Sequence, residues 1–153
     1  MHTKTEVIYL LKYAKDTNDL FTELHENSNI KNYLRRNRDE FVLPLGEYLE
    51  NLLAQKNLTK QAVIEKSGVQ REYAYHIFSG IKKNPSRPKI LALAFAMELN
   101  LEETQYLLRY AKQSPLYPRN PWDSIIISAI EQKLTVLQTN ELLNQLGETT
   151  FLG

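Results

Sequence analysis

Residues Leu58 to Gly80, LTKQAVIEKSGVQREYAYHIFSG, contain the pattern on which we base our interpretation of the whole chain. The stretch predicts two short helices joined by a tight turn. Thr59 is expected to cap the first helix, because its hydroxyl can accept a hydrogen bond from a backbone N–H of the first turn. Gly68 is expected at the reversal, since glycine adopts the positive φ that such a turn often needs.

The two helices are expected to pack on each other through apolar side chains. Val63 and Ile64 supply the apolar face of the first helix, and Ala74, Ile77 and Phe78 recur at helical spacing in the second. The polar side chains of the second helix are then presented outward: Gln70, Arg71, Glu72, Tyr75, His76 and Ser79. This combination is typical of a helix-turn-helix, in which the second helix is the exposed one.

The stretch resembles the helix-turn-helix of the Cro and λ-repressor family, the XRE class. The resemblance rests on Leu58-Thr59-Lys60 at the opening, Gly68-Val69 at the turn and Ile77-Phe78-Ser79-Gly80 at the end. It extends over residues 45–108, less than half of the chain. It implies a compact five-helix DNA-binding domain whose second motif helix enters the major groove.

Two departures from the family pattern bear on this resemblance. Lys60 stands where the family usually has a glutamine, which favours a phosphate contact over a base contact. Ile64 and Ala74 exchange the usual small and large residues of the two helices. The summed volume is roughly kept, and cores tolerate such exchanges.

The composition predicts an all-α protein. The chain has 153 residues, 5 glycines, 6 prolines and long stretches of good helix formers. We divide it into an N-terminal helical extension (1–43), a λ-repressor-like helix-turn-helix domain (44–113), and a proline-rich connector with a C-terminal helical hairpin (114–153). The absence of cysteine, of a membrane-length apolar run and of a signal-peptide pattern favours a cytoplasmic protein.

Helices are expected throughout these three parts. In the central part, Asn100 and Glu103 have the spacing of a capping box, which opens the fifth helix of the domain. In the connector, Leu116 and Tyr117 are expected to be anchors, and Asn120 is expected to cap the helix that follows. The expected helices outside the motif cover residues 3–15, 20–24, 30–34, 45–57, 86–97, 100–111, 121–130 and 135–146.

Positive charge is concentrated on the motif. The net charge of the chain is only +1, yet residues 44–113 carry ten basic and seven acidic side chains, whereas 1–43 sum to zero and 114–153 to −2. Residues 56–89 contain eight basic side chains against two acidic ones. Such a distribution indicates a module that contacts phosphates. A mixed charge run at 35–40 is either a solvated helix end or a secondary phosphate contact.

The sequence therefore predicts a transcriptional regulator that reads double-stranded DNA. By match to the family pattern, Gln70 and Arg71 reach base edges, with glutamine suited to adenine and arginine to guanine. Glu72, Tyr75 and His76 follow on the same helix, and Glu72 can accept from cytosine. The phosphate contacts are expected from four basic side chains, which are Lys60, Lys82, Lys83 and Arg87.

A second interpretation stays open, in which the same fold binds a protein. Tyrosines, an acid and an arginine on one helix also suit a protein interface, as in an antitoxin or an adaptor for a kinase or toxin. The sequence contains no phosphate-binding glycine loop, no metal-ligand cluster and no nucleophile triad, so neither an enzyme nor a cofactor is expected.

The flanks are expected to contribute to a homodimer, since one helix-turn-helix reads only a short half-site. Part of their apolar surface is expected to pack onto the central domain, and the remainder is the candidate interface. The apolar residues concerned are Val7, Leu10, Leu11, Phe21 and Leu24 at one end, and Trp122, Ile126, Ile130, Leu142, Leu143 and Leu146 at the other. The alternative is that both flanks only enlarge the core of a monomer.

Overall fold

The computed structural model describes residues 17–26, 29–38, 41 and 43–152. Within these residues all regular structure is helical, which confirms the all-α prediction. The helices are α2 (Thr17–Glu26), α3 (Ile30–Arg36), α4 (Leu45–Lys56), α5 (Lys60–Ser67), α6 (Arg71–Ser79), α7 (Arg87–Ala96), α8 (Leu101–Tyr110), α9 (Pro121–Glu131) and α10 (Val136–Gln145). The helix expected at 3–15, with Val7, Leu10 and Leu11, lies outside the described residues.

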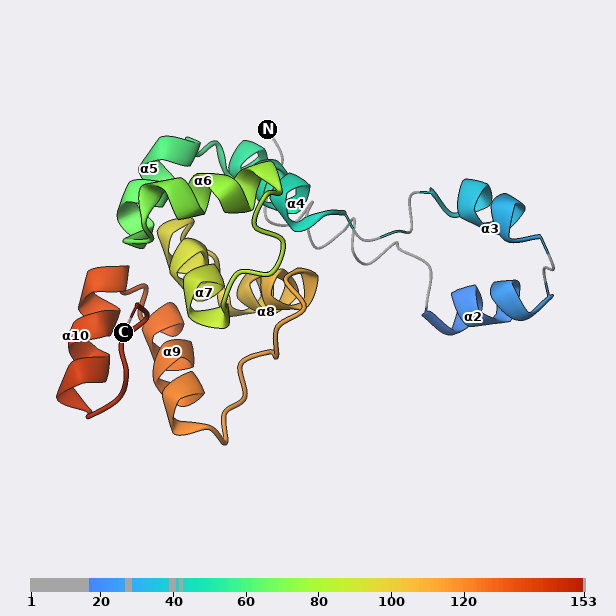
Figure 1. Ribbon diagram of the computed structural model, residues 1–153. Helices are drawn as coiled ribbons and strands as arrows, with labels where there is room; N and C mark the ends of the chain where they lie inside the picture. Colours follow the sequence, from blue (N-terminus) through green and yellow to red (C-terminus); the bar gives the residue numbers. More distant parts are fainter. Residues whose placement is uncertain (1–16, 27–28, 39–40, 42, 153) are drawn as a thin grey trace.

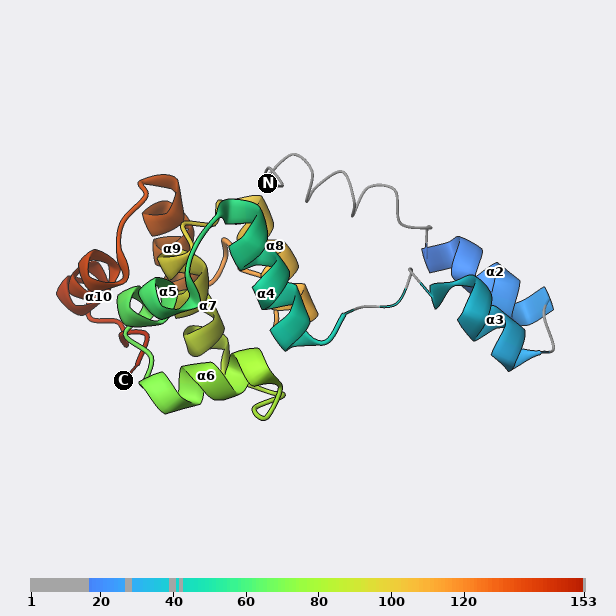
Figure 2. The ribbon, with the colours of Figure 1, turned by 90° about the horizontal axis from the view of Figure 1, so that it is seen from above.

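Helix α7 is the centre of the core. All its side chains from Ile90 to Ala96 are buried, so it is apolar around its whole circumference and must be covered on every side. Helices α5, α8 and α10 all contact it. Figures 1 and 2 show α7 enclosed by the helices of the motif on one side and by the C-terminal helices on the other.

Helices α4 and α6 approach each other closely at Gly46. A Cβ atom at this position would overlap the carbonyl oxygen of Phe78, a backbone atom at the end of α6 that cannot rotate away. Glycine is therefore required here by packing, because the helix itself would accept any good helix former. This contact fixes the position of α6 relative to the first helix of the central domain.

The helix ends follow local signals that the sequence shows. The Thr59 hydroxyl accepts from Ala62 N at 3.3 Å, and Gly68 is left-handed with φ 71°, as predicted. Asn100 and Glu103 form the predicted capping box, with bonds of 2.8 and 2.9 Å. Asn120 caps α9 by accepting from Asp123 N, as predicted.

The C-terminal hairpin of α9 and α10 belongs to the same core as the central domain. Ile126 and Leu143 have no exposed surface, and both join the cluster that includes α7. Phe151 closes the cluster with its ring edge against Phe95, the two centroids 5.2 Å apart. Part of the apolar surface of this flank was expected to pack onto the central domain, and Ile126, Ile130 and Leu143 do so, which leaves them unavailable to an interface.

The connector before α9 matches its prediction only in part. Leu116 is buried as an anchor, but the side chain of Tyr117 is exposed, so its expected anchoring role is wrong. The backbone of Tyr117 instead donates a hydrogen bond to the Asp123 carboxylate at 2.9 Å. The residue holds the connector through its N–H and not through its ring.

Helices α2 and α3 form a separate pair. Tyr33 is buried between them, and the Arg36 guanidinium contacts the Glu23 carboxylate at 3.0 Å. Asn29 caps α3 by accepting from Asn32 N. Figures 1 and 2 both show this pair apart from the other helices.

Candidate nucleic-acid interface

The turn between α5 and α6 is fixed by local hydrogen bonds. The Ser67 hydroxyl donates to Ile64 O at 2.7 Å and accepts from Val69 N at 3.1 Å, on both sides of Gly68. Ser67 itself is fully buried. The turn is thus held by a satisfied buried hydroxyl together with a left-handed glycine, and it sets the angle between the two motif helices.

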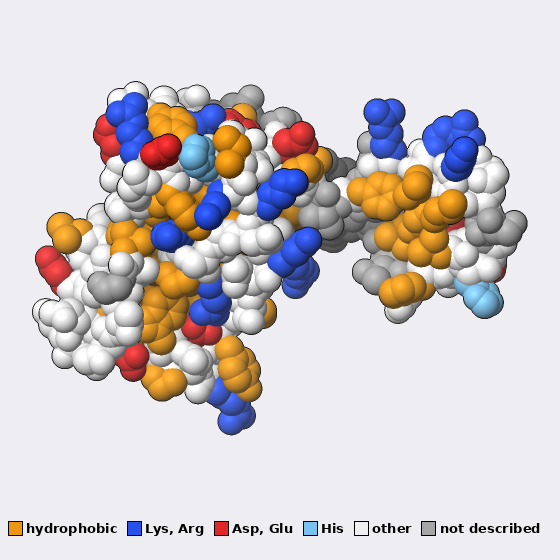
Figure 3. Space-filling model, in the orientation of Figure 1, with side chains coloured by type: hydrophobic (Ala, Val, Ile, Leu, Met, Phe, Trp, Pro, Cys, Tyr) orange, Lys and Arg blue, Asp and Glu red, His pale blue; other side chains and the backbone are white. Residues whose placement is uncertain are grey.

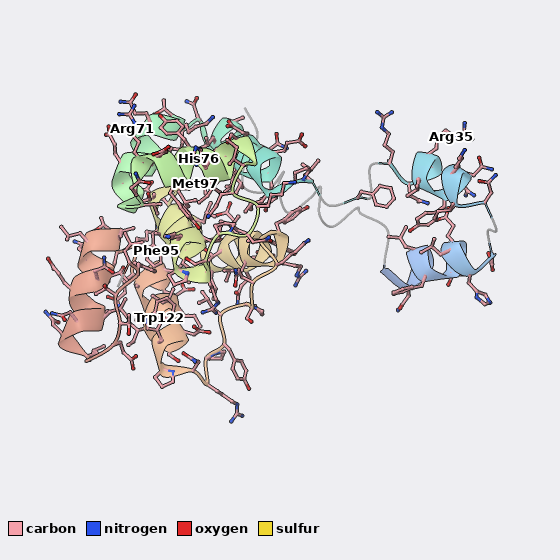
Figure 4. The ribbon with its side chains drawn as sticks, in the orientation of Figure 1. Arg35, Arg71, His76, Phe95, Met97 and Trp122 are labelled. Atoms are coloured by element: carbon pink, nitrogen blue, oxygen red, sulfur yellow. The ribbon has the colours of Figure 1, made fainter. Side chains whose placement is uncertain are left out.

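Helix α6 has the predicted inner and outer faces. Ala74, Ile77 and Phe78 are buried against α4 and the core. Arg71 and Glu72 are exposed. Tyr75 and His76 are half-buried at the edge of the outer face, and Figure 4 shows where Arg71 and His76 lie on α6. Tyr73 packs partly buried against the core.

Gln70 has a role that the sequence interpretation missed. It lies one residue before α6, and its side-chain oxygen accepts from Tyr73 N at 2.8 Å as the N-cap. Bidentate recognition of adenine needs both the oxygen and the nitrogen of a glutamine amide. In this conformation the Gln70 oxygen already accepts one backbone hydrogen bond, so bidentate recognition of adenine would use the second lone pair of that oxygen together with the amide nitrogen.

Arg71 and Tyr75 form a pair on the outer face of α6. The guanidinium carbon lies 5.7 Å from the centroid of the Tyr75 ring, which is within the range of a cation–π interaction. The two side chains also line a small hollow, of about 140 Å³, together with Gln61, Glu65 and the Gly68 turn. Stacking on the ring orients the guanidinium before any ligand binds, which lowers the entropy cost of a later contact.

A cluster of lysines follows α6. The Lys82 and Lys89 ammonium nitrogens lie 5.2 and 3.9 Å from the centroid of the Tyr73 ring, and Lys83 is exposed in the same loop. None of the three lysines has a carboxylate partner among the described residues. Lys89 was counted in the basic stretch but was not selected as a site residue. The signal that could have identified it is its position in the first turn of α7, close to the basic loop.

Lys60 is less free than predicted. Its ammonium pairs with the Glu50 carboxylate on α4 and lies 5.4 Å from the centroid of the Phe78 ring. Both partners are partly exposed, so the ion pair is weak and a phosphate could compete for the lysine. Lys60 therefore stays a candidate for a phosphate contact, which would require breaking its ion pair with Glu50.

Arg87 is held inside the protein. Its guanidinium donates to both oxygens of Asp123 at 2.8 and 2.9 Å, and to the carbonyl oxygens of Ser114 and Pro115 at 2.9 and 3.1 Å. Burial alone would raise the pKa of Asp123, but the hydrogen bonds from Arg87 and from Tyr117 N, with the charge of Arg87, hold this pKa below its usual value. With these donors occupied, Arg87 joins α7 to the connector, and we leave it out of the proposed interface.

Several basic side chains lie around the motif helices. Figure 3 shows Lys and Arg side chains spread over α5, α6 and the loop after α6, with a few acidic ones among them. Groups of three or more acidic or histidine side chains that could hold a metal ion are absent from the part of the chain that the structure describes. The described helices are also too short or too polar to cross a membrane.

A groove of about 610 Å³ lies away from these residues. The turn after α7 and the turn between α9 and α10 form its walls, which include Phe95, Leu99 and Val136. Lys66 and Lys133 stand at the same groove. This hollow could accept an apolar group of a partner.

Comparison with known proteins gives no relative from which to assign the site. No protein-family model, no curated protein and no solved structure matches this chain.

Proposed function

We propose that this chain is a sequence-specific regulator that binds double-stranded DNA, with α6 in the major groove. The central domain, α4 to α8, would then be a λ-repressor-like five-helix unit. The observation that supports this best is the outer face of α6 and its following loop. Arg71 is pre-oriented on Tyr75 there, and Lys82, Lys83 and Lys89 lack carboxylate partners among the described residues.

The proposed contacts divide into two kinds. Arg71, Glu72, Tyr75 and His76 would face base edges, together with Gln70, whose amide also caps the helix. The phosphate contacts would come from the lysines around the helix, which are Lys60, Lys82, Lys83 and Lys89. Base contacts set the sequence preference, whereas phosphate contacts set affinity and its dependence on salt.

The experiment that tests this assignment is selection of a preferred site from random duplexes, followed by binding measurements. We expect Arg71→Ala to lose about 1–3 kcal/mol on the selected site and to relax the base preference. Lys83→Ala should weaken binding to every sequence alike. If no site is enriched, or if both variants bind as the parent does, α6 does not read DNA.

The alternative function is a protein-interaction module with little DNA binding, such as an antitoxin or an adaptor for a kinase or toxin. It is favoured by the Arg71–Tyr75 pair, since arginine and tyrosine are enriched at the centres of protein interfaces, and by the groove beside α9 and α10. Under this alternative, affinity for random duplex DNA would be negligible at low salt, and a substitution in the groove would impair partner binding.

A further inference from the structure

The α2–α3 pair carries an unusual share of the exposed apolar surface. Large hydrophobic side chains that are about 40–65% exposed cluster there, and they are Phe21, Leu24, Ile30, Leu34 and, beside the Tyr33 ring, Phe41. Phe21 and Leu24 are three residues apart on α2, and Ile30 and Leu34 are four apart on α3, so each set lies on one helix face. Figure 3 shows hydrophobic side chains extending across both helices.

Two short helices of this kind do not make a stable unit alone. Tyr33 is the buried apolar residue between them, whereas helices as short as α2 and α3 are marginal in water without tertiary packing. An apolar face of this extent on a protein surface indicates an interface. The charges of the two helices indicate which kind of partner covers this face.

The two helices have opposite charge. Helix α2 carries Asp19, Glu23 and Glu26 and no lysine or arginine, whereas α3 carries Lys31, Arg35 and Arg36 and no acid. Glu23 and Arg36 pair within the hairpin, but Asp19, Glu26 and Lys31 have no ion pair with another described residue. Taken together, the two helices sum to zero, so a strongly acidic or basic partner has no advantage. A second copy of this chain does have an electrostatic advantage, since its basic helix can lie over the acidic helix of the first copy.

We propose that the α2–α3 pair is a homodimer interface in which α2 of one copy lies over α3 of the other. A two-fold axis parallel to the helices produces this arrangement twice, so that each acidic helix faces a basic one. Neighbouring helices pack 8–10 Å apart, which is about the Debye length at physiological salt, so the helix charges attract across the interface.

The exposed area sets the expected strength. Five side chains that are about half exposed offer on the order of 400 Å² of apolar surface per copy, about half of the area that each partner buries in a standard dimer. The dimer should therefore dissociate in the micromolar range. The interface uses neither α6 nor its lysines, so it is independent of the proposed DNA binding.

The first test compares two substitutions by analytical ultracentrifugation of the full chain. The double variant Phe21→Glu with Leu34→Glu should be monomeric at concentrations where the parent is a dimer. Leu137→Glu is the matched control, since Leu137 is 69% exposed on α10, and it should leave the dimer intact. Equal far-ultraviolet circular dichroism shows that the variants keep the helices. A parent that stays monomeric at high micromolar concentration, or a double variant that dimerises normally, overturns the proposal.

The second test reverses the charges. Asp19→Lys with Glu26→Lys makes both helices basic, and Lys31→Glu with Arg35→Glu leaves both acidic. Each charge variant should lose most of its self-association, and an equimolar mixture should form a heterodimer. A mixture that remains monomeric removes the proposed pairing of acidic and basic helices. Because these measurements contain no DNA, their failure leaves the proposed function standing, and the reverse also holds.

Discussion

The two flanks of the central domain look alike in sequence but differ in the structure. Both are amphipathic helical hairpins too short to fold alone. The C-terminal pair, α9 and α10, buries Ile126 and Leu143 in the common core. Arg87 donates hydrogen bonds to Asp123 in the first turn of α9. The N-terminal pair has the ion pair of the exposed Arg36 with the largely buried Glu23, and it leaves Phe21 65% exposed. The comparison teaches that an amphipathic helix joins a core only where a tertiary anchor brings it there.

The anchor is a set of side-chain hydrogen bonds that joins α7, the connector and α9. One arginine at the start of α7 holds two connector carbonyls and one carboxylate at once. Gln105 adds a second crossing, because its side-chain amide donates to Leu116 O and accepts from Leu116 N. A comparable set of side-chain bonds does not join α2 or α3 to α4 among the described residues.

The largest expected effect comes from truncating one leucine in each hairpin. Leu143→Ala should lower the free energy of unfolding by about 4 kcal/mol, because Leu143 is fully buried and its removal leaves a cavity. Leu34→Ala, at a side chain that is 48% exposed, should cost less than about 1 kcal/mol under monomeric conditions. Urea denaturation measures both. Similar losses for the two variants would break the comparison.

The anchor itself gives the next effect. Asp123→Ala should destabilise the fold by about 3 kcal/mol, since it leaves the Arg87 guanidinium partly buried without its carboxylate. Arg36→Ala is the matched control in the other hairpin. It breaks a pair whose arginine is 61% exposed and whose glutamate is 17% exposed, and it should change the free energy of unfolding by about 1 kcal/mol or less. A loss at Arg36 as large as that at Asp123 would show that the N-terminal pair is anchored too.

The same carboxylate predicts a pH dependence. The pKa of Asp123 is lowered in the fold, so the ionised group contributes its full stabilisation above the unfolded pKa of about 4 and loses it as the pH falls through the folded pKa. The stability difference between the parent and Asp123→Asn should therefore be largest near pH 7 and should shrink as the pH falls toward 3. Unfolding curves for both proteins at the two pH values measure this. A gap that does not change with pH would mean that the charge of Asp123 adds nothing.

Local signals in the sequence predicted the helices well, but they did not predict contacts between residues that are distant in the sequence. Thr59, Gly68 and Asn100 act within four residues of themselves, so their roles could be inferred from spacing. The positions of Arg87 and Asp123 are 36 residues apart, and no local pattern indicates that they meet. Arg87 was consequently taken for a phosphate contact.

The candidate site shows the same limit. The inner and outer faces of α6 follow from the helical period. Gln70 was placed on the helix although it caps it, a difference of one residue that gives its amide oxygen a structural hydrogen bond as well. The stacking of Lys89 on Tyr73 joins α7 to α6, so it was visible only in the folded chain.

The smallest expected effect is on DNA affinity, and it compares a lysine beside α6 with an arginine of the C-terminal connector. Lys89→Gln should lower the affinity for any duplex modestly and reduce the salt slope of binding by about 1, because it removes one phosphate contact. Arg119→Gln, at an exposed arginine of the C-terminal connector, is the matched control and should change neither quantity. Fluorescence anisotropy with a labelled duplex measures both variants. An equal change in the two would mean that net charge alone attracts DNA.

The most direct test of the central claim is the affinity of the intact protein for random double-stranded DNA as a function of salt. With at least four lysines around α6 contacting phosphates, the logarithm of the association constant should fall linearly with the logarithm of the salt concentration, with a slope of about −3 or steeper. No measurable binding at low salt, or an affinity that does not change with salt, would contradict the assignment of α6 and its lysines to DNA.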